Sequence, residues 1–152
     1  MRWTMKEFLQ LPHVKLTCDI HCVTTWSKLD MEWGGVPFRV IEELVKPTLD
    51  ARFVIQEAEQ GYTTNLPLDD YRRENVLVAD WADGKPLEDE HGGPVRMLVP
   101  HRYFWKSAKW LRKLHFSDVD VRGYWEERGY HNRADPWGEE RYSHQEEPPY
   151  PG

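Results

Sequence analysis

The chain contains 152 residues, of which 39% are hydrophobic and 30% charged, and its formal net charge is −6. This length suits one domain, and the 13% of aromatic residues, including eight Trp, argue against a disordered chain. An acidic chain lacks the general basic face that nucleic-acid binding requires, so we expect no nucleic-acid partner. No stretch approaches the about 20 apolar residues of a membrane span. With no visible secretory signal and two cysteines, we expect a cytoplasmic protein, provided that no signal precedes Met1.

The first third of the chain predicts short helices and strands in alternation. Thr4 and Glu7 have the spacing of a capping box, in which each side chain accepts a hydrogen bond from the other residue's backbone N–H. Apolar residues then recur first with the period of a strand and later with the period of a helix. The predicted elements are a helix over residues 5–11, a strand over 14–20, a turn over 34–38, a helix over 38–46 and a strand over 51–57.

The remaining sequence predicts short strands separated by loops. In chain order we expect a loop with one helical turn over 61–75, a buried strand over 76–80, a turn and loop over 82–94, a short strand over 95–100, a loop followed by a strand over 103–116, and helical turns over 124–130. Short strands without a regular βαβ succession predict the α+β class. One domain is expected over residues 1–142, followed by a flexible acidic, Pro-rich tail over residues 143–152.

The two cysteines, Cys18 and Cys22, lie four positions apart. Cys18 is on the predicted inner face of the strand over 14–20, where a cysteine behaves as a small apolar residue. Cys22 follows the strand end, where a thiolate could act as a nucleophile or as a ligand to a soft metal. Plain packing is the more common role for such residues. A zinc site would need two histidines to complete the set, because no second cysteine pair exists; the candidates are His13, His21 and His91.

Basic residues gather in the segment 91–113 of this acidic chain. They are His91, Arg96, His101, Arg102, Lys106, Lys109, Arg112 and Lys113. The segment begins with the sequence HGGP, whose glycines leave backbone N–H groups open to an anion. A guanidinium can bind phosphate through two hydrogen bonds, with an ammonium beside it. The alternative is a solvated strand face with extended side chains. Charge of one sign beside a Gly-Gly turn favours an anionic ligand.

Other chemistry-bearing patterns are weaker. Tyr130, near Trp125, could serve as a proton donor, although a tyrosine in such a place more often packs its ring. The chain contains no GxGxxG, P-loop, HExxH or GxSxG motif. Nucleotide binding by the common routes is therefore not expected.

Four stretches in order carry a family resemblance: CDIHCVTTWSKLD, GYTTNLPLDD, DGKPLEDEHGGPVRMLVPHRYFWKSAKWL and GYWEERGYHNRADPW. Together they resemble the oxidoreductase molybdopterin-binding domain of the sulfite oxidase superfamily, most closely its short bacterial members. The resemblance implies a mixed-sheet α+β fold. It also implies a molybdenum cofactor, two-electron oxygen-atom transfer to or from a small-molecule substrate, and a separate electron-transfer partner, because no haem motif is present.

The resemblance assigns roles to six residues. Cys22 matches the cysteine whose thiolate ligates molybdenum. His91 and Arg96 match residues that hold the pterin and its phosphate, and Ser107 and Lys109 match residues that complete this anion site. Tyr130 resembles the active-site tyrosine of sulfite oxidases.

Two departures from the family pattern modify these expectations. Sulfite oxidases carry an asparagine–arginine pair soon after the ligand cysteine, whereas this chain has Thr25, Trp26, Ser27 and Lys28, so sulfite is not the expected substrate. The chain also begins where family members are already inside the domain, which predicts that the N-terminal part of the fold is lacking. Two alternatives follow: a truncated, cofactor-free form of the domain without activity, or a small zinc-binding interaction module.

Overall fold

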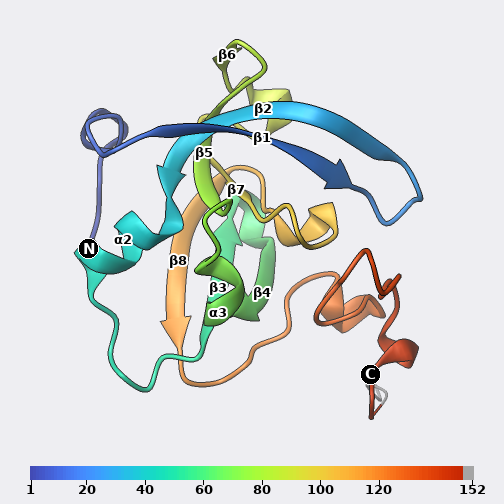
Figure 1. The fold of residues 1–152 in the computed structure, drawn as a ribbon. Helices are drawn as coiled ribbons and strands as arrows, with labels where there is room; N and C mark the ends of the chain where they lie inside the picture. Colours follow the sequence, from blue (N-terminus) through green and yellow to red (C-terminus); the bar gives the residue numbers. More distant parts are fainter. Residues whose placement is uncertain (149–152) are drawn as a thin grey trace.

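The computed structural model of the chain describes residues 1–148 and contains two antiparallel sheets with short helices between them (Figure 1). The first sheet comprises β1 (Val14–His21), β2 (Ser27–Pro37), β5 (Leu77–Ala82), β6 (Lys85–Pro86) and β7 (Arg96–Leu98). The second comprises β3 (Phe53–Ala58), β4 (Thr63–Pro67) and β8 (Leu111–Ser117). The α-helices are α1 (Met5–Phe8), α2 (Phe38–Val45) and α3 (Leu68–Tyr71). Among residues 1–148 no helix is both long and apolar enough to cross a membrane.

The predicted α+β class is confirmed, and every described strand pairing is antiparallel. The first sheet has the order β1-β2-β5-β6, with β7 also paired to β5, and the second has the order β4-β3-β8. The strands predicted over 14–20, 51–57, 76–80, 95–100 and the end of 103–116 are all present. The predicted helical turns over 124–130 form one short 3₁₀ helix, η4 (Glu126–Arg128).

The capping box at the start of the chain is present. The Thr4 amide donates to the Glu7 carboxylate over 2.7 Å, and the Glu7 amide donates to the Thr4 hydroxyl over 3.2 Å. Helix α1 ends at Phe8, so it is shorter than the helix predicted over 5–11. Phe8 is buried and anchors this turn to the main core.

The turn predicted over residues 34–38 is wrong, because residues 34–37 belong to the inner end of β2. Gly35 faces Ala79 of β5, and a Cβ at Gly35 would lie 2.2 Å from the Val78 carbonyl oxygen. The glycine therefore permits close approach of two strand backbones, which is a recognised use of glycine inside a sheet.

The loop predicted over 61–75 contains strand β4, which the sequence pattern concealed. Its Thr64 and Asn65 are polar and fully buried, so the strand shows no apolar alternation. The Thr64 hydroxyl donates to the Glu126 carboxylate, and the Asn65 amide donates to Asp120 over 2.6 Å. The helical turn expected in this stretch is α3.

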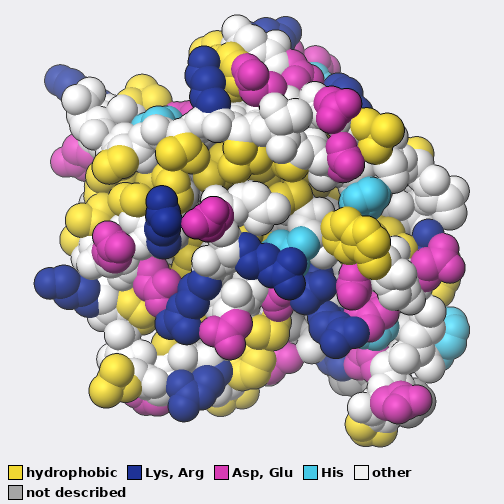
Figure 2. All heavy atoms as spheres, in the orientation of Figure 1, with side chains coloured by type: hydrophobic (Ala, Val, Ile, Leu, Met, Phe, Trp, Pro, Cys, Tyr) yellow, Lys and Arg dark blue, Asp and Glu magenta, His cyan; other side chains and the backbone are white. Residues whose placement is uncertain are grey.

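The main core lies where the two sheets meet α2 and α3. It is built from Phe8, Val36, Phe38, Ile41, Val54, Leu66, Leu68, Tyr71, Val76, Val78, Met97 and Val99. A smaller cluster covers the other end of the first sheet, with Ile20 of β1, Trp33 of β2 and Leu98 of β7 buried together and Cys18 packed against them. Figure 2 shows charged side chains of both signs interspersed on one face, with a hydrophobic band beneath the β1–β2 hairpin.

The tail predicted over residues 143–152 begins with a short helical turn. A 3₁₀ helix, η5 (Ser143–Gln145), follows a bridge between Tyr130 and Tyr142. The Glu146 carboxylate accepts hydrogen bonds from the Asn132 amide over 2.9 Å and from the Arg122 guanidinium. Hydrogen bonds and charge pairing thus link Glu146 to the preceding part of the chain. The flexibility of the tail stays a prediction. Residues 149–152 of the predicted tail lie outside the described residues.

Candidate functional site

The thiol of Cys22 lies in the turn that joins β1 to β2. The Cys22 amide donates to the Trp26 carbonyl over 2.9 Å, and the Thr25 amide donates to the Cys22 carbonyl over 3.1 Å. Thr25 has a φ of 75°, the left-handed conformation that closes this turn. Cys22 is partly exposed, and its Sγ lies 3.1 Å from the Thr24 hydroxyl oxygen. The thiol therefore sits at a strand end, as the sequence predicted, and not inside the core.

Cys18 has a different environment. It stands opposite Met31 in the β1–β2 ladder and packs against the smaller core cluster. Burial, together with the nearby Asp19 carboxylate, raises the pKa of the Cys18 thiol to about 11. The thiol stays protonated at neutral pH and behaves as a packing residue. Both cysteines are free, without a disulfide.

The alternative of a zinc site on Cys18, Cys22 and two histidines finds no matching cluster among residues 1–148. Among residues 1–148, the His, Cys, Asp and Glu side chains close enough together to hold one metal ion are Glu88, Glu90 and His91. This group contains no thiol and all three residues are exposed. The zinc-binding module built on Cys18, Cys22 and two histidines is therefore not supported.

Arg96, at the start of β7, is 3% exposed. Its guanidinium donates to three backbone carbonyls: that of His91 over 3.0 Å, that of Ser107 over 2.9 Å and that of Met97 over 3.3 Å. Burial lowers the pKa of Arg96 to about 9, so the group is still a cation at neutral pH. Within residues 1–148 no carboxylate forms an ion pair with it. The charge is buried, and the contacts that compensate it are carbonyl dipoles and the faces of the Phe104 and Trp33 rings.

The other predicted anion-site residues surround this guanidinium. The Ser107 hydroxyl accepts a hydrogen bond from the Val99 amide over 2.8 Å. Lys109 donates to the Glu90 carbonyl over 3.2 Å, and its pKa is lowered by burial and by the charge of Arg96. The structure therefore brings Arg96, Ser107 and Lys109 together. His91 contributes its backbone carbonyl, while its imidazole is 64% exposed beside Glu90.

A buried donor without an acceptor lies beside Arg96. The buried indole N–H of Trp33 has no hydrogen-bond acceptor among the described residues. The Arg96 guanidinium carbon stands 5.7 Å from the centre of the Trp33 ring and 4.3 Å from that of Phe104. A buried cation without a counter-charge and a buried N–H without an acceptor both match a ligand rich in acceptor oxygens or nitrogens. The residues present thus fit an anionic, heteroaromatic group.

Cys22 and Arg96 belong to the same sheet but are not in direct contact. Both lie two residues from members of the smaller core cluster, Ile20 and Leu98 respectively. Among the described residues no hydrogen bond joins Cys22 to the Arg96 cluster. The first sheet sets their relative positions.

Tyr130 lies in an aromatic cluster outside these two groups. Its ring meets Trp105 edge-on at 5.2 Å and Trp125 edge-on at 5.3 Å, and it contacts Tyr142 at 5.9 Å. Trp105 stacks on Tyr103 at 5.6 Å. The cluster therefore connects Tyr130 to the segment that follows β7.

Sequence reasoning missed two groups of buried charges. Lys106 and Glu126 are fully buried and pair over 3.4 Å. Asp70 accepts hydrogen bonds from His101 over 2.9 Å and from Arg102 over 2.7 Å. Burial by itself would raise the pKa of Asp70, but these two partners lower it below its usual value. The signal in the sequence was the basic run itself, which contains both structural and unpaired cations.

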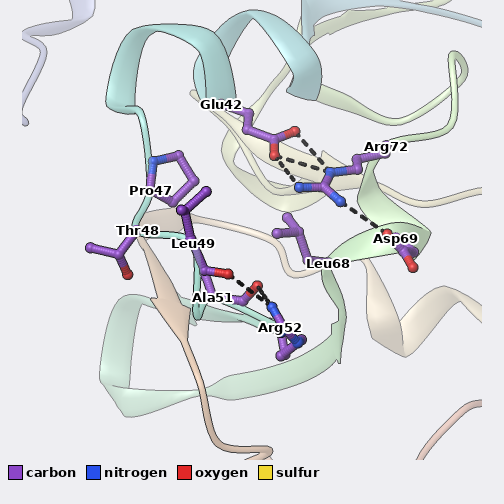
Figure 3. A pocket seen from close by; sticks show the side chains of 9 residues that line it. All are labelled: Glu42, Pro47, Thr48, Leu49, Ala51, Arg52, Leu68, Asp69 and Arg72. Carbon is purple, nitrogen blue, oxygen red and sulfur yellow. Dashed lines mark hydrogen bonds and ion pairs between the residues drawn. The ribbon is translucent and has the colours of Figure 1, made fainter.

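Two surface hollows lie away from the predicted site. One, of about 550 Å³, lies between the end of α2 and α3, and Figure 3 shows Arg72 held by Glu42 and Asp69 across it. The other, of about 800 Å³, is lined by the N-terminal residues and β8. Neither hollow is lined by any of the six residues to which the resemblance assigned roles.

The fold and the site define a class: an α+β domain with a strand-end thiol and an uncompensated buried cation on one sheet. A family model described as the oxidoreductase molybdopterin binding domain matches residues 1–125. The chain is 46% identical over 143 residues to the uncharacterized oxidoreductase YuiH of Bacillus subtilis, covering 94% of this chain and 72% of that protein. This chain belongs to the oxidoreductase molybdopterin-binding domain family, as its sequence predicted.

More distant similarities agree with this family. The chain is 28% identical over 155 residues to the protein-methionine-sulfoxide reductase catalytic subunit MsrP of Campylobacter jejuni, covering 88% of this chain and 52% of that protein. The crystal structure of the sulfane dehydrogenase SoxCD from Paracoccus pantotrophus aligns with a TM-score of 0.71 at 22% identity, over 78% of this chain and 35% of that chain. The chain thus spans about half of the MsrP protein, and the SoxCD likeness shows the fold.

Proposed function

We propose that this chain is a molybdenum-cofactor-dependent oxidoreductase domain in which Cys22 is the protein ligand to molybdenum. The support is the contrast between the two thiols. Cys22 lies in a partly exposed turn beside a hydroxyl, whereas Cys18 is packed, with its pKa raised by burial. A cysteine sulfur is a suitable ligand for a soft metal centre, and a partly exposed turn leaves it accessible to one.

The observation that carries the proposal is the buried Arg96 guanidinium without a carboxylate partner. A buried cation is costly unless a charge or several hydrogen bonds compensate it. A phosphate would supply the missing charge, and Lys109, whose pKa is lowered partly by Arg96, would gain from the same anion. We assign phosphate and pterin binding to Arg96, Lys109, Ser107 and His91. His91 would act with its backbone or after its exposed imidazole turns inward.

When bound, the cofactor supplies a two-electron redox centre for oxygen-atom transfer. The chain's own contribution is to hold and orient that group: Cys22 from the β1–β2 turn, and Arg96 and Lys109 from the segment around β7. Tyr130 is proposed as a proton donor, and its ring is fixed for that role by Trp105 and Trp125. The electrons pass to or from a separate protein. The name of the MsrP relative, a catalytic subunit, is consistent with such a partner.

Sulfite is not the proposed substrate. The stretch after Cys22 has no arginine to bind a small oxyanion, and its Trp26 is 50% exposed. Trp137, 70% exposed, packs against His21 on the other side of the thiol turn. Exposed tryptophans suit an apolar or thioether-like group more than a compact dianion. Methionine sulfoxide, named for the MsrP relative, is the first substrate to assay beside sulfite.

The test is the molybdenum and pterin content of Cys22→Ser and Cys18→Ser variants, purified beside the wild type from a host that synthesises the cofactor. We expect near-stoichiometric molybdenum in the wild type and in Cys18→Ser, because Cys18 is a packing residue. Cys22→Ser should lose most of its molybdenum or show an altered electronic spectrum, with its unfolding midpoint unchanged.

Different results would favour the alternatives. A folded wild type without molybdenum or pterin would identify the chain as a cofactor-free form of the domain. Zinc in the wild type, lost together with folding in Cys22→Ser, would identify the zinc-binding module, because structural zinc contributes folding free energy. Equal molybdenum content and the same electronic spectrum in all three proteins would contradict the assignment of Cys22 as ligand.

A further inference from the structure

The tip of the β1–β2 hairpin, residues 21–26, carries Cys22 and projects away from the main core (Figure 1). The residues that follow it in β2, Ser27 to Asp30, are exposed. Such a two-stranded ribbon has little stability of its own and opens locally at low cost. Contacts from outside the hairpin therefore decide how firmly the thiol is held.

The segment 131–146 supplies these contacts. It lies next to the hairpin tip (Figure 1) and beyond residues 1–125, to which the family model extends. Within the described residues, the hydrogen bonds and ring contacts that reach residues 21–26 from outside the hairpin come from Trp137 and Arg141. They meet His21 and Val23, the two sequence neighbours of Cys22.

Arg141 contacts the turn at Val23, the residue that follows Cys22. Its Nε donates a hydrogen bond to the Val23 carbonyl over 3.2 Å. The same guanidinium lies 5.2 Å from the centre of the Tyr103 ring and 3.3 Å from the Glu139 carboxylate. Tyr103 is 2% exposed, so the guanidinium rests on a side chain that cannot move freely. The hydrogen bond to Val23 is thus made by a donor already fixed on two sides.

Trp137 contacts the hairpin at His21, the residue that precedes Cys22. Its ring meets the His21 ring edge-on, with centroids 5.2 Å apart and planes at 69°. His21 Nδ1 is 2.9 Å from the Ser27 hydroxyl, so the contact extends across both strands of the hairpin. An edge-to-face aromatic pair of this geometry is attractive.

The segment that carries both residues is itself braced. The His131 amide donates to the Arg141 carbonyl over 3.0 Å. The Gln145 side-chain oxygen accepts from the Arg141 amide over 2.9 Å and from the Tyr142 amide over 2.8 Å. These bonds fix the backbone at Arg141, so its side chain acts from a rigid base.

We propose that Arg141 and Trp137 are positioning residues that clamp the hairpin tip on both sides of Cys22 and keep its thiol in one place. A ligand held in advance binds its metal without a further ordering cost. The link to molybdenum rests on the proposed function. The clamp itself is a property of the chain and can be tested without the cofactor.

The test is the rate at which iodoacetamide alkylates Cys22 and Cys18 in the full-length, cofactor-free chain, followed by peptide mass spectrometry across a range of pH. The pH profile separates thiol ionisation from accessibility, which is the plateau rate at high pH. We expect Arg141→Ala and Trp137→Ala to raise the Cys22 plateau by roughly three- to tenfold, the size of one lost hydrogen bond or ring contact. The Cys18 rate should not change.

Two further variants complete the design. Arg133→Ala is the matched control, because Arg133 lies in the same segment, its side chain is 58% exposed, and it pairs with Glu140 and not with the hairpin. It should behave as the wild type. Arg141→Lys keeps a charged donor and should restore part of the protection.

Unchanged Cys22 plateaus in both Arg141→Ala and Trp137→Ala would overturn the clamp. A parallel rise at Cys18 would also overturn it, because the whole first sheet would then have loosened. Trp137 is largely exposed, so its variant tests the proposal even where Arg141→Ala fails to fold. Absence of molybdenum in the wild type would contradict the proposed function and leave these rates unaffected.

Discussion

Two buried cations on the same basic segment, Lys106 and Arg96, are compensated in opposite ways. Lys106 is fully buried, donates to the Asn65 carbonyl over 2.7 Å and pairs with the buried Glu126 carboxylate over 3.4 Å. Arg96 is also buried, but in the described residues it meets carbonyl dipoles and two aromatic rings and no carboxylate. The first cation completes the fold with a charge from the chain itself. The second leaves a positive charge for a ligand to neutralise.

The comparison is informative because burial disfavours the charged form of both groups. Burial lowers the pKa of Lys106, while Glu126 opposes that shift. Burial lowers the pKa of Arg96 to about 9 with no carboxylate to oppose it. An internal partner indicates a structural role, and its absence at a buried site indicates a binding role.

The largest effect is expected from Glu126→Gln, which removes the partner of Lys106. A buried ammonium without its carboxylate should lower the free energy of unfolding by about 3–5 kcal/mol. Urea denaturation of the variant and the wild type measures this difference. Glu127→Gln, at the exposed neighbouring position, is the control and should change stability by no more than about 0.5 kcal/mol. Equal stability of the two variants would show that the Lys106–Glu126 pair does not stabilise the fold.

Arg96→Met should lower stability less than Glu126→Gln does. Its main effect should be the loss of bound cofactor. Three carbonyls lose a donor, which costs about 1–3 kcal/mol, but an uncompensated charge is also removed. The bound pterin and molybdenum should fall more than about tenfold, because a hydrogen-bonded charge pair with phosphate is lost. Metal and pterin analysis measures the second effect. Arg112→Met, whose side chain is 65% exposed on β8, should retain the cofactor. A stability loss as large as that of Glu126→Gln would contradict the distinction between the two cations.

The smallest effect is a change in pH dependence in Lys109→Met. Burial and the charge of Arg96 lower the pKa of Lys109 below its usual 10.5, so the unfolded chain binds more protons in the interval between the two values. Stability contributed by this group therefore rises as the pH increases through that interval. The rise of unfolding free energy with pH, measured up to about pH 10.5, should be steeper in the wild type than in the variant, which keeps only the contribution of Arg96. The same slope in both proteins would show that folding does not lower the pKa of Lys109.

The sequence by itself determined the family, the α+β class and most strands. Period-two and helical patterns predicted β1, β5 and α2, because their buried faces are apolar and their spacing follows from backbone geometry. The four ordered motifs predicted the oxidoreductase molybdopterin-binding domain family, which the family match confirms. Cys22 was distinguished from Cys18 by its place after a strand end. The roles of the individual site residues are still predictions.

Only the tertiary structure decided the elements and groups that depend on partners distant in the sequence. Strand β4 is hidden because its buried Thr64 and Asn65 are satisfied by side chains more than fifty residues away. The sequence at the inner end of β2 resembles a turn because it contains two glycines. In the structure these glycines let the backbone of β2 approach β5 closely. Local spacing carries no information about such partners.

The same reason separates Lys106 from Arg96. Both are basic residues of one segment, and nothing in the run of charges distinguishes them. Glu126 reaches Lys106 because η4 packs beside β4, and no described carboxylate reaches Arg96. Whether a buried charge serves the fold or awaits a ligand is decided by what the folded chain brings within a few ångströms of it.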